Sequence, residues 1–363
     1  MFSSLPYEIM YNLYDYLQYR DIQNLFKSFD KELYSKGLQY GKKYVLRKRL
    51  FPLEIIDSKL FFAKKIKLTE HYELEELEML NKQDSKFAVY FSDIFDKNIN
   101  LDKYSSNIYK VVFGDKFNKK IISVPDGIKK MYFGSNYNKQ FNFHNCELTH
   151  IKFGSAFDQS VDELPKNLEY LIFSHFNQNV NKLPNKIKFV RFGPSFSKSL
   201  NDLPDSVEHL SIDSCFSRDI IMKKIPDNLK ILDIKSDLVF LLNNAQIKKK
   251  IDTLIISDTY NAQNTDNIMS LFDYDTIIIK ASIYYELNCD VLSPFAKRIE
   301  ILNNNVSIDD LPDSIEHISL DKSFTSIINK LPKNLKTITF SSNYKGLFLR
   351  SKLDFKNIQV KFY

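Results

Sequence analysis

Histidine and cysteine are among the side chains that can hold a metal ion or move a proton, and this chain has six histidines and three cysteines. The sequence has no Cys-x-x-Cys pair, no His-Glu-x-x-His run and no glycine-rich phosphate loop. His150, His209 and His317 share one slot of a repeat, where strand alternation directs side chains outward. We interpret them as drift on a solvated surface. Three cysteines cannot supply the roughly eight ligands of a two-zinc RING site. We therefore expect no enzyme activity, no catalytic residue, no metal and no cofactor.

The histidines belong to a pattern, apolar–x–x–apolar–x–apolar, that recurs twelve times between residues 108 and 340. Its apolar i, i+2 pair indicates a strand with both side chains on one face. A fixed period of about 20–29 residues with this pattern is typical of a leucine-rich-repeat-like solenoid, with one parallel strand per coil. The last apolar residue of each copy serves below as the reference residue of its coil. The twelve reference residues are Phe113, Phe133, Phe153, Phe173, Phe192, Ile212, Ile234, Ile256, Ile279, Ile301, Leu320 and Phe340.

The remainder of each coil is also patterned. Gly or Ser follows the strand, as at Gly114, and we expect a tight turn that needs glycine's permissive backbone angles. A recurring aromatic should stack into an inner spine, and the Asn or Asp after it should hydrogen-bond turn backbone. An apolar-Pro pair such as Leu183-Pro184 should keep the return segment extended. Residues 235–305 lose these marks, and we interpret them as diverged coils.

Two further strands are expected at the ends of the array. Phe87-Val89-Phe91 predicts a degenerate strand before the first copy, and Ile358-Val360-Phe362 predicts a capping strand after the last.

These marks resemble FNIP repeats, a leucine-rich-repeat-like family of social amoebae and giant viruses. The resemblance rests on Leu168-x-x-Leu171-x-Phe173, Phe176-Asn177-Gln178 and Leu183-Pro184, with matching copies on either side. It covers about 230 of the 363 residues. It implies the architecture and does not identify the ligand.

The N-terminal segment has a different pattern. Ser4 and Pro6 suit a helix start, apolar residues from Ile9 follow helical spacing, and Asp21 suits the cap of a second helix. Over about 40 residues this segment resembles an F-box, a family that binds a Skp-type adaptor of a cullin–RING ubiquitin ligase. It departs from that family at Met10-Tyr11 and at Phe26-Lys27-Ser28. The alternative is an amphipathic helical cap on the solenoid. The resemblance implies adaptor contacts by Leu5, Pro6, Ile9, Leu13, Leu17, Ile22 and Leu25.

The outward strand slots, one and three residues before each reference residue, form the predicted target-binding face. In the early coils they combine basic and aromatic side chains, which are enriched at interface hot spots. We therefore expect a partner with acidic character. The alternative is that the rings are half-buried between neighbours on the sheet. The predicted target-binding residues are Lys110, Lys130, Tyr132, His150, Lys152, Tyr170, Phe189, Arg191 and His209.

Composition indicates which classes of partner and which cellular compartment to expect. The net charge is only +6, and 7 of the 51 basic residues are Arg, so nucleic-acid binding is not indicated. No charged and apolar leader begins the chain, and no apolar run approaches ~18 residues. Three scattered cysteines indicate a reducing compartment. We expect a cytoplasmic protein, with the nucleus left open, that binds no membrane and is monomeric outside its complex.

The sequence thus predicts an α+β protein in three parts. Residues 1–45 form an α-helical F-box, 46–85 a helical connector with an acidic helix over 72–80, and 86–363 a solenoid of 12–13 coils. The predicted function is the substrate-recognition subunit of an SCF-type cullin–RING ubiquitin ligase, which binds a Skp-type adaptor and an unknown target protein. The alternative is a non-degradative interaction scaffold or an adaptor decoy.

Overall fold

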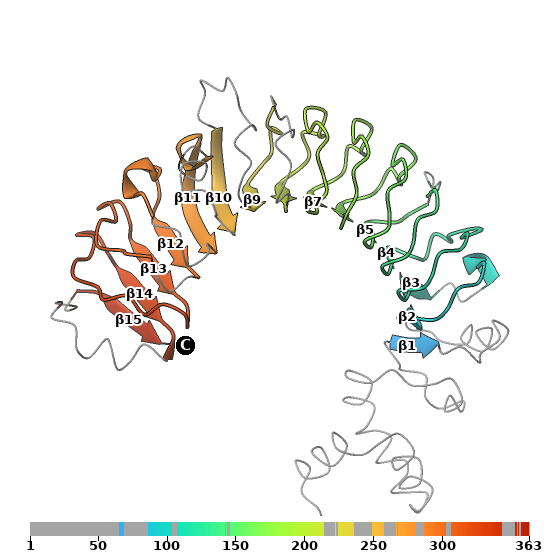
Figure 1. Cartoon of the computed structure of the whole chain (residues 1–363), viewed down its shortest axis with the longest axis horizontal. Coiled ribbons are helices and arrows are strands. Elements are labelled where there is room, and N and C mark those ends of the chain that lie inside the picture. The colour runs from blue at the N-terminus through green and yellow to red at the C-terminus, as the bar shows by residue number, and fades with distance from the viewer. Residues whose placement is uncertain are drawn as a thin grey trace, which may run out of the picture. The chain divides into compact units, whose positions relative to one another are not determined.

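The structure is a computed structural model in which the chain forms two compact units, Met1–Met131 and Tyr132–Tyr363 (Figure 1). It describes residues 65–68, 86–103, 107–141, 143, 146–213, 222, 224–235, 249–257, 266, 268–280, 287–302, 306–342, 353, 355 and 357–362.

Both units are built from short parallel strands that pair in chain order. The first unit holds β1 (Lys65–Leu68), β2 (Phe87–Phe91) and β3 (Ile108–Val112), and β4 (Lys130–Tyr132) spans the unit boundary. The second unit continues with β5 (His150–Lys152), β6 (Tyr170–Ile172), β7 (Phe189–Phe192), β8 (His209–Ile212), β9 (Ile231–Lys235), β10 (Lys249–Ser257), β11 (Phe272–Lys280), β12 (Arg298–Ile301), β13 (His317–Leu320), β14 (Thr337–Phe340) and β15 (Gln359–Phe362).

The strand register is the register of the repeat. Tyr170 pairs with Phe189 and Phe189 pairs with His209, so residues in the same slot of successive coils lie side by side. The twelve predicted strand positions coincide with β3 to β14, and all twelve reference residues are buried. Within the second unit the strands line the inner side of the curved stack, and the return segments lie outside them (Figure 1). The solenoid predicted from the period is therefore confirmed.

The core contains the predicted aromatic spine. Phe153 and Phe157 are fully buried, with ring centroids 3.7 Å apart and planes 8° from parallel. Phe157 also stacks between Tyr137 and Phe176 of the neighbouring coils, at 6.2 Å from each. Tyr137, Phe157, Phe176 and Phe196 thus form a column in which each of these four coils adds one ring, and the column links neighbouring coils.

Asn and Asp after the spine residue join one coil to the next, as expected. Asn138 Oδ1 accepts the backbone N–H of Asp158 at 3.0 Å, and Asp158 Oδ1 accepts that of Asn177 at 2.8 Å. Asn177 Oδ1 in turn accepts the N–H of Ser197 at 2.8 Å. The series supplies partners for turn backbone that strand pairing does not reach.

The glycine after the strand has a different cause from the one predicted. A Cβ on Gly154 would lie 1.9 Å from the carbonyl oxygen of Gly134, and one on Gly193 would lie 1.5 Å from that of Ser174. Neither glycine has a φ in the left-handed region. Close approach of the preceding coil, and not an unusual backbone angle, therefore selects glycine at these positions.

Prolines begin the turn that leads into the next strand. The carbonyl of Pro165 accepts the N–H of Leu168 at 3.1 Å, and Pro184 and Ile187 repeat this bond at 3.2 Å. The turn places Leu168 and Ile187, five residues before their reference residues, in the core. A coil of about twenty residues thus closes with an extended return and two turns.

The predicted α+β class is wrong, because the described residues form a parallel β-solenoid. Their helical elements are single turns, η3 (Leu101–Lys103), η4 (Cys289–Val291) and a short helical stretch at 266 and 268–270. The returns are too short, and too often interrupted by proline, to hold a longer helix. The α-helical F-box predicted over 1–45 and the acidic helix predicted over 72–80 lie outside the described residues. β1 lies within the predicted connector, so strand pairing begins before residue 86.

Candidate binding face of the strand ladder

The slot three residues before the reference residue forms a column of rings on the outward face of β5 to β8. We call His150, Tyr170, Phe189 and His209 the aromatic column. Successive ring centroids lie 5.2, 4.2 and 4.7 Å apart, with the last pair edge to face. All four side chains are partly exposed. Tyr170 and Phe189 each contact a neighbouring ring on both sides along the column, and the part of the four rings left exposed is an apolar surface with polar ends.

Beside the aromatic column, the slot one residue before the reference residue changes in polarity from coil to coil. Lys152 is exposed, Ile172 and Arg191 are partly exposed, and Ser211 is buried. Arg191 Nε donates to Asp213 Oδ2 at 2.9 Å, and its Nη2 contacts the same oxygen. Asp213 is only 7% exposed, so Arg191 compensates a largely buried carboxylate. The charge of Arg191 is therefore already neutralised by an ion pair within the protein.

His209 ends the aromatic column, and the carboxylate of Asp233 acts on its ring. Ser211 beside it donates to Asp233 Oδ2 at 3.2 Å. Burial, and to a smaller extent Lys280, lowers the pKa of His209, while Asp233 opposes the shift. Its Nε2 is buried and has no hydrogen-bond partner among the described residues. His209 is therefore held neutral at neutral pH, and it contributes a ring and no charge to this face.

The predicted target-binding residues do not form one described cluster. Lys110 and Lys130 belong to the unit Met1–Met131, where the Lys110 ammonium lies 5.5 Å from the centre of the Tyr90 ring. Tyr132 and Lys152 belong to the other unit with the aromatic column. Within that unit, Lys152 is the predicted cation whose charge remains exposed, since Arg191 is paired.

Sequence reasoning missed a second feature, a charge ladder in the slot four residues before the reference residue. Glu169, Lys188, Glu208 and Lys230 alternate in sign along β6 to β9. Lys188 lies 3.4 Å from Glu169, and Lys230 lies 2.7 Å from Glu208 and lowers the pKa of that carboxyl by its hydrogen bond. The alternation was readable from the aligned copies. It joins neighbouring coils at the edge where the strands begin.

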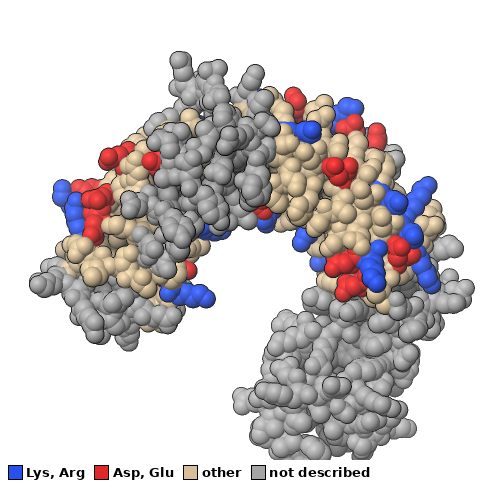
Figure 2. Space-filling model, in the orientation of Figure 1, with Lys and Arg blue, Asp and Glu red and all other residues tan. Residues whose placement is uncertain are grey.

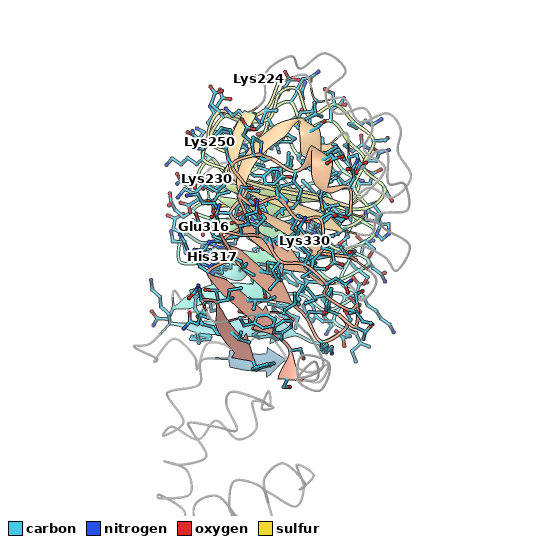
Figure 3. The ribbon with its side chains drawn as sticks, turned by 90° about the vertical axis from the view of Figure 1, so that its left-hand side faces the viewer. Lys224, Lys230, Lys250, Glu316, His317 and Lys330 are labelled. Carbon is cyan, nitrogen blue, oxygen red and sulfur yellow. The ribbon has the colours of Figure 1, made fainter. Side chains whose placement is uncertain are left out.

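Charge on the outer surface is similarly mixed. Figure 2 shows Lys and Arg next to Asp and Glu over the described part of the visible face. Figure 3 shows Lys230, Lys250 and Glu316 on the same side of the ribbon, along the edge where the strands begin. Both signs of charge thus occur along this edge.

His150, His209 and His317 occupy the same slot but lie too far apart to bind one metal ion. They lie on β5, β8 and β13, and strands stack ~4.8 Å apart, so even the nearest two are separated by roughly 14 Å. A zinc ion needs nitrogen ligands at about 2 Å. Among the described residues no group of three His, Cys, Asp or Glu side chains could hold a metal ion.

The Cys289 thiol is not activated for nucleophilic chemistry. Burial raises the pKa of the Cys289 thiol to about 11, which leaves it protonated and a poor nucleophile near neutral pH. In the part of the chain that the structure describes, no helix has the length and apolar character to cross a membrane.

Comparison with known proteins supports the repeat. Residues 303–343 match the family model of the FNIP Repeat, a stretch that contains β13, β14 and the Leu331-Pro332 pair. No curated protein matches the chain.

Among solved structures, the chain is similar to one titled "The crystal structure of CroV588 a novel circular LRR protein structure". The TM-score is 0.50 with 19% sequence identity, over 80% of this chain and 61% of that chain. This chain therefore spans less than two thirds of that protein, and the similarity concerns the fold. The FNIP-repeat resemblance is thus confirmed at residues 303–343, and the leucine-rich-repeat-like solenoid is confirmed as the fold.

Proposed function

We propose that this chain is a non-catalytic protein–protein interaction scaffold whose partner binds the aromatic column and the exposed side chains beside it. The observation that supports this most strongly is the run of four partly exposed rings in register on β5 to β8. A solenoid presents such in-register side chains as an extended rigid surface.

The column already has the form that a recognition surface needs. Its rings are held by mutual stacking and by the strand register, so binding orders few additional side-chain torsions. Tyr170 and Phe189 lie at its centre, 4.2 Å apart, where a partner would exclude water most fully. Lys152 adds an exposed positive charge at its side, which favours a partner with a carboxylate nearby.

The test is co-purification from cells that express the intact chain. The double variant Tyr170→Ala/Phe189→Ala should lose the captured partner. The matched control, Thr253→Ala/Thr276→Ala, changes the same slot on β10 and β11 and should retain it. Far-UV circular dichroism and urea denaturation establish that each variant is folded. A folded double variant that retains every captured protein would contradict the proposal.

A more specific form of the proposal is a substrate-recognition subunit of an SCF-type cullin–RING ubiquitin ligase. It is supported by the F-box-like sequence that begins at Leu5-Pro6-x-x-Ile9 and precedes the repeat array. This segment would bind a Skp-type adaptor, and the strand face would hold the target so that its lysines meet the ubiquitin-charged enzyme. Transfer would then depend on proximity supplied by the scaffold.

Purified components test this form directly. The intact chain should capture a Skp-type adaptor with its cullin, and Leu5→Ala/Pro6→Ala/Ile9→Ala should not. Tyr170→Ala/Phe189→Ala should keep the adaptor, because it changes only the target face. Capture of adaptor but no ubiquitination of any bound protein would favour the adaptor-decoy alternative. Failure of the intact chain to capture the adaptor would reject the ligase role and leave the scaffold.

A further inference from the structure

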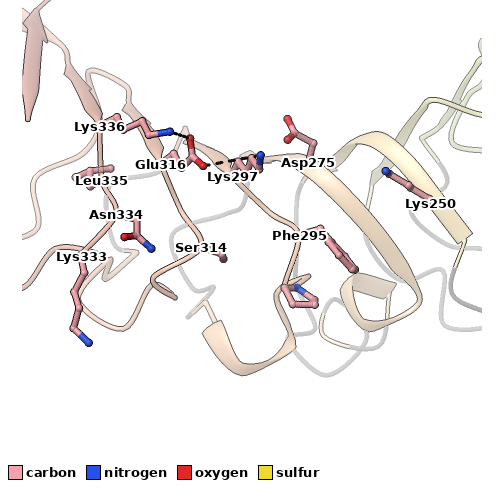
Figure 4. Close-up of a pocket in the computed structure, with 11 residues that line it drawn as sticks. Lys250, Asp275, Phe295, Lys297, Ser314, Glu316, Lys333, Asn334, Leu335 and Lys336 are labelled. Carbon is pink, nitrogen blue, oxygen red and sulfur yellow. Dashed lines mark hydrogen bonds and ion pairs between the residues drawn. The ribbon is translucent and has the colours of Figure 1, made fainter.

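A cleft of about 840 Å³ lies along one edge of the sheet from β10 to β14, beside the residues that lead into β12, β13 and β14 (Figure 4). It is separate from the aromatic column, which occupies the outward face of β5 to β8. Its lining includes Phe295 and the four lysines Lys250, Lys297, Lys333 and Lys336. A volume of this size suits a short peptide segment or a small ligand.

Phe295 departs from the repeat at this edge. It occupies the slot six residues before the reference residue, which holds a polar residue or glycine in the other eleven copies. Examples are Asn167, Ser206 and Asn334. The turn does not require the ring, because Ala296 N–H donates to Ser293 O at 3.0 Å through backbone alone. Phe295 is nevertheless 59% exposed, and neither the turn nor the core gives a structural reason for a large apolar side chain in this slot.

The charges around Phe295 leave an excess of lysine. Lys336 hydrogen-bonds Glu316, and Lys297 approaches the same carboxylate at 4.0 Å, so two ammonium groups share one carboxylate (Figure 4). Lys333 pairs with Asp313 at 3.1 Å. Lys250 is exposed and forms no ion pair with a described residue. The cleft is therefore complementary to a ligand that brings one or two separate negative charges.

We propose that this cleft is a second binding site, for an acidic segment of a partner protein that packs an apolar side chain on Phe295. Carboxylates of the segment pair with Lys250 and with Lys297, which otherwise shares Glu316. A continuous phosphate backbone fits less well, although nucleic acids stack on exposed rings. Asp275 and Glu316 line the same cleft and would repel it, whereas the spaced carboxylates of a peptide avoid them. This site has its own partner chemistry and does not depend on the aromatic column.

The test uses the intact chain and a phage-displayed library of random peptides. Phe295→Asn is the key variant, because it restores the residue type of Asn334 in the same slot and should leave the fold intact. The matched control is Ile327→Asn, since Ile327 is 75% exposed and does not line the cleft. For charge, Lys250→Glu is compared with Lys322→Glu, another exposed lysine outside the lining.

The selected peptides should carry net negative charge and a large apolar or aromatic residue. In fluorescence anisotropy, Phe295→Asn and Lys250→Glu should each weaken binding by about tenfold or more, as for a hot-spot contact. Both control variants should bind as the wild type does. The proposal is overturned by enrichment of uncharged or basic peptides, by unchanged binding to Phe295→Asn, or by no enrichment over the bare support. Binding of an oligothymidylate probe that depends on Phe295 would assign the cleft to nucleic acid instead.

Discussion

Substitution of Gly193 by alanine tests the packing of coil against coil. Gly193 follows β7, and a Cβ there would lie 1.5 Å from the carbonyl oxygen of Ser174 in the preceding coil. Cβ atoms essentially never approach another atom within 3.0 Å, so the two segments would have to separate by about 1.5 Å. The obstructing atom is backbone, and no side-chain rotation can relieve the contact.

The expected cost follows from two opposing effects. Overpacking a well-packed interior costs about 1–3 kcal/mol, and a backbone clash belongs at the upper end. Replacing glycine also removes freedom from the unfolded chain, which stabilises the folded state by about 0.4–1 kcal/mol. The net prediction for Gly193→Ala is a loss of about 2 kcal/mol in the free energy of unfolding.

Urea denaturation followed by far-UV circular dichroism measures this change. Hydrogen exchange of peptides that cover β6 and β7 shows whether the loss is local, since a solenoid need not unfold in a single step. The matched control is Ser174→Ala, which changes the same slot in the preceding coil. It removes only the hydrogen bond from Ser174 Oγ to Phe153 O at 3.1 Å, and should cost about 0.5–1.5 kcal/mol. If Gly193→Ala is as stable as the wild type, or costs less than Ser174→Ala, close approach is not why glycine occupies this slot.

Three further predictions concern the spine, the aromatic column and the charge ladder. Phe157→Ala removes a fully buried ring stacked at 3.7 Å on Phe153, and should cost about 3–5 kcal/mol in urea unfolding. The pKa of His209 is lowered in the fold, so the unfolded chain binds the proton more tightly. Wild-type stability should therefore be full above pH 6.5 and fall below it, and His209→Gln should reduce that fall. Lys230→Gln should leave the urea midpoint nearly unchanged, because its ion pair with Glu208 is exposed.

Each of these has an outcome that would contradict it. A loss below about 1 kcal/mol for Phe157→Ala would mean that the spine carries little of the stability. An unaltered acid profile in His209→Gln would show that other groups cause the decline. A large drop in the urea midpoint for Lys230→Gln would make the charge ladder a major source of stability.

The strands and core were predictable from this sequence because inward-facing residues must be apolar in every coil. The slots of Leu171 and Phe173 recur, and each repetition strengthens the inference. β1 escaped prediction because Ile66 and Leu68 form one short pair without the rest of the pattern. The α+β class is wrong because the described residues form a parallel β-solenoid with extended returns, as the apolar-Pro pairs predicted. The helices that led to that class were predicted in residues 1–85, and the described part of that range contains only β1.

The candidate site was only partly predictable, because the outward residues depend on contacts between coils. The ring slots of Tyr170 and Phe189 follow from alternation, and their stacking follows from the register. Arg191 pairs with Asp213, which lies 22 positions away in the sequence. This contact neutralises a charge that the sequence analysis assigned to target binding. Phe295 was detectable as the single apolar residue in its slot, but the cleft around it depends on side chains from several coils.

Site-specific photo-crosslinking tests most directly whether the strand face binds a partner. A benzoylphenylalanine placed at Ile172, beside the aromatic column, is compared with one at the exposed Asn179 in the return segment of the same coil. Irradiation in cells that express the intact chain should give a discrete protein adduct from position 172 and none from position 179. Adducts from 179 alone, or the same adducts from both positions, would contradict recognition by the strand face.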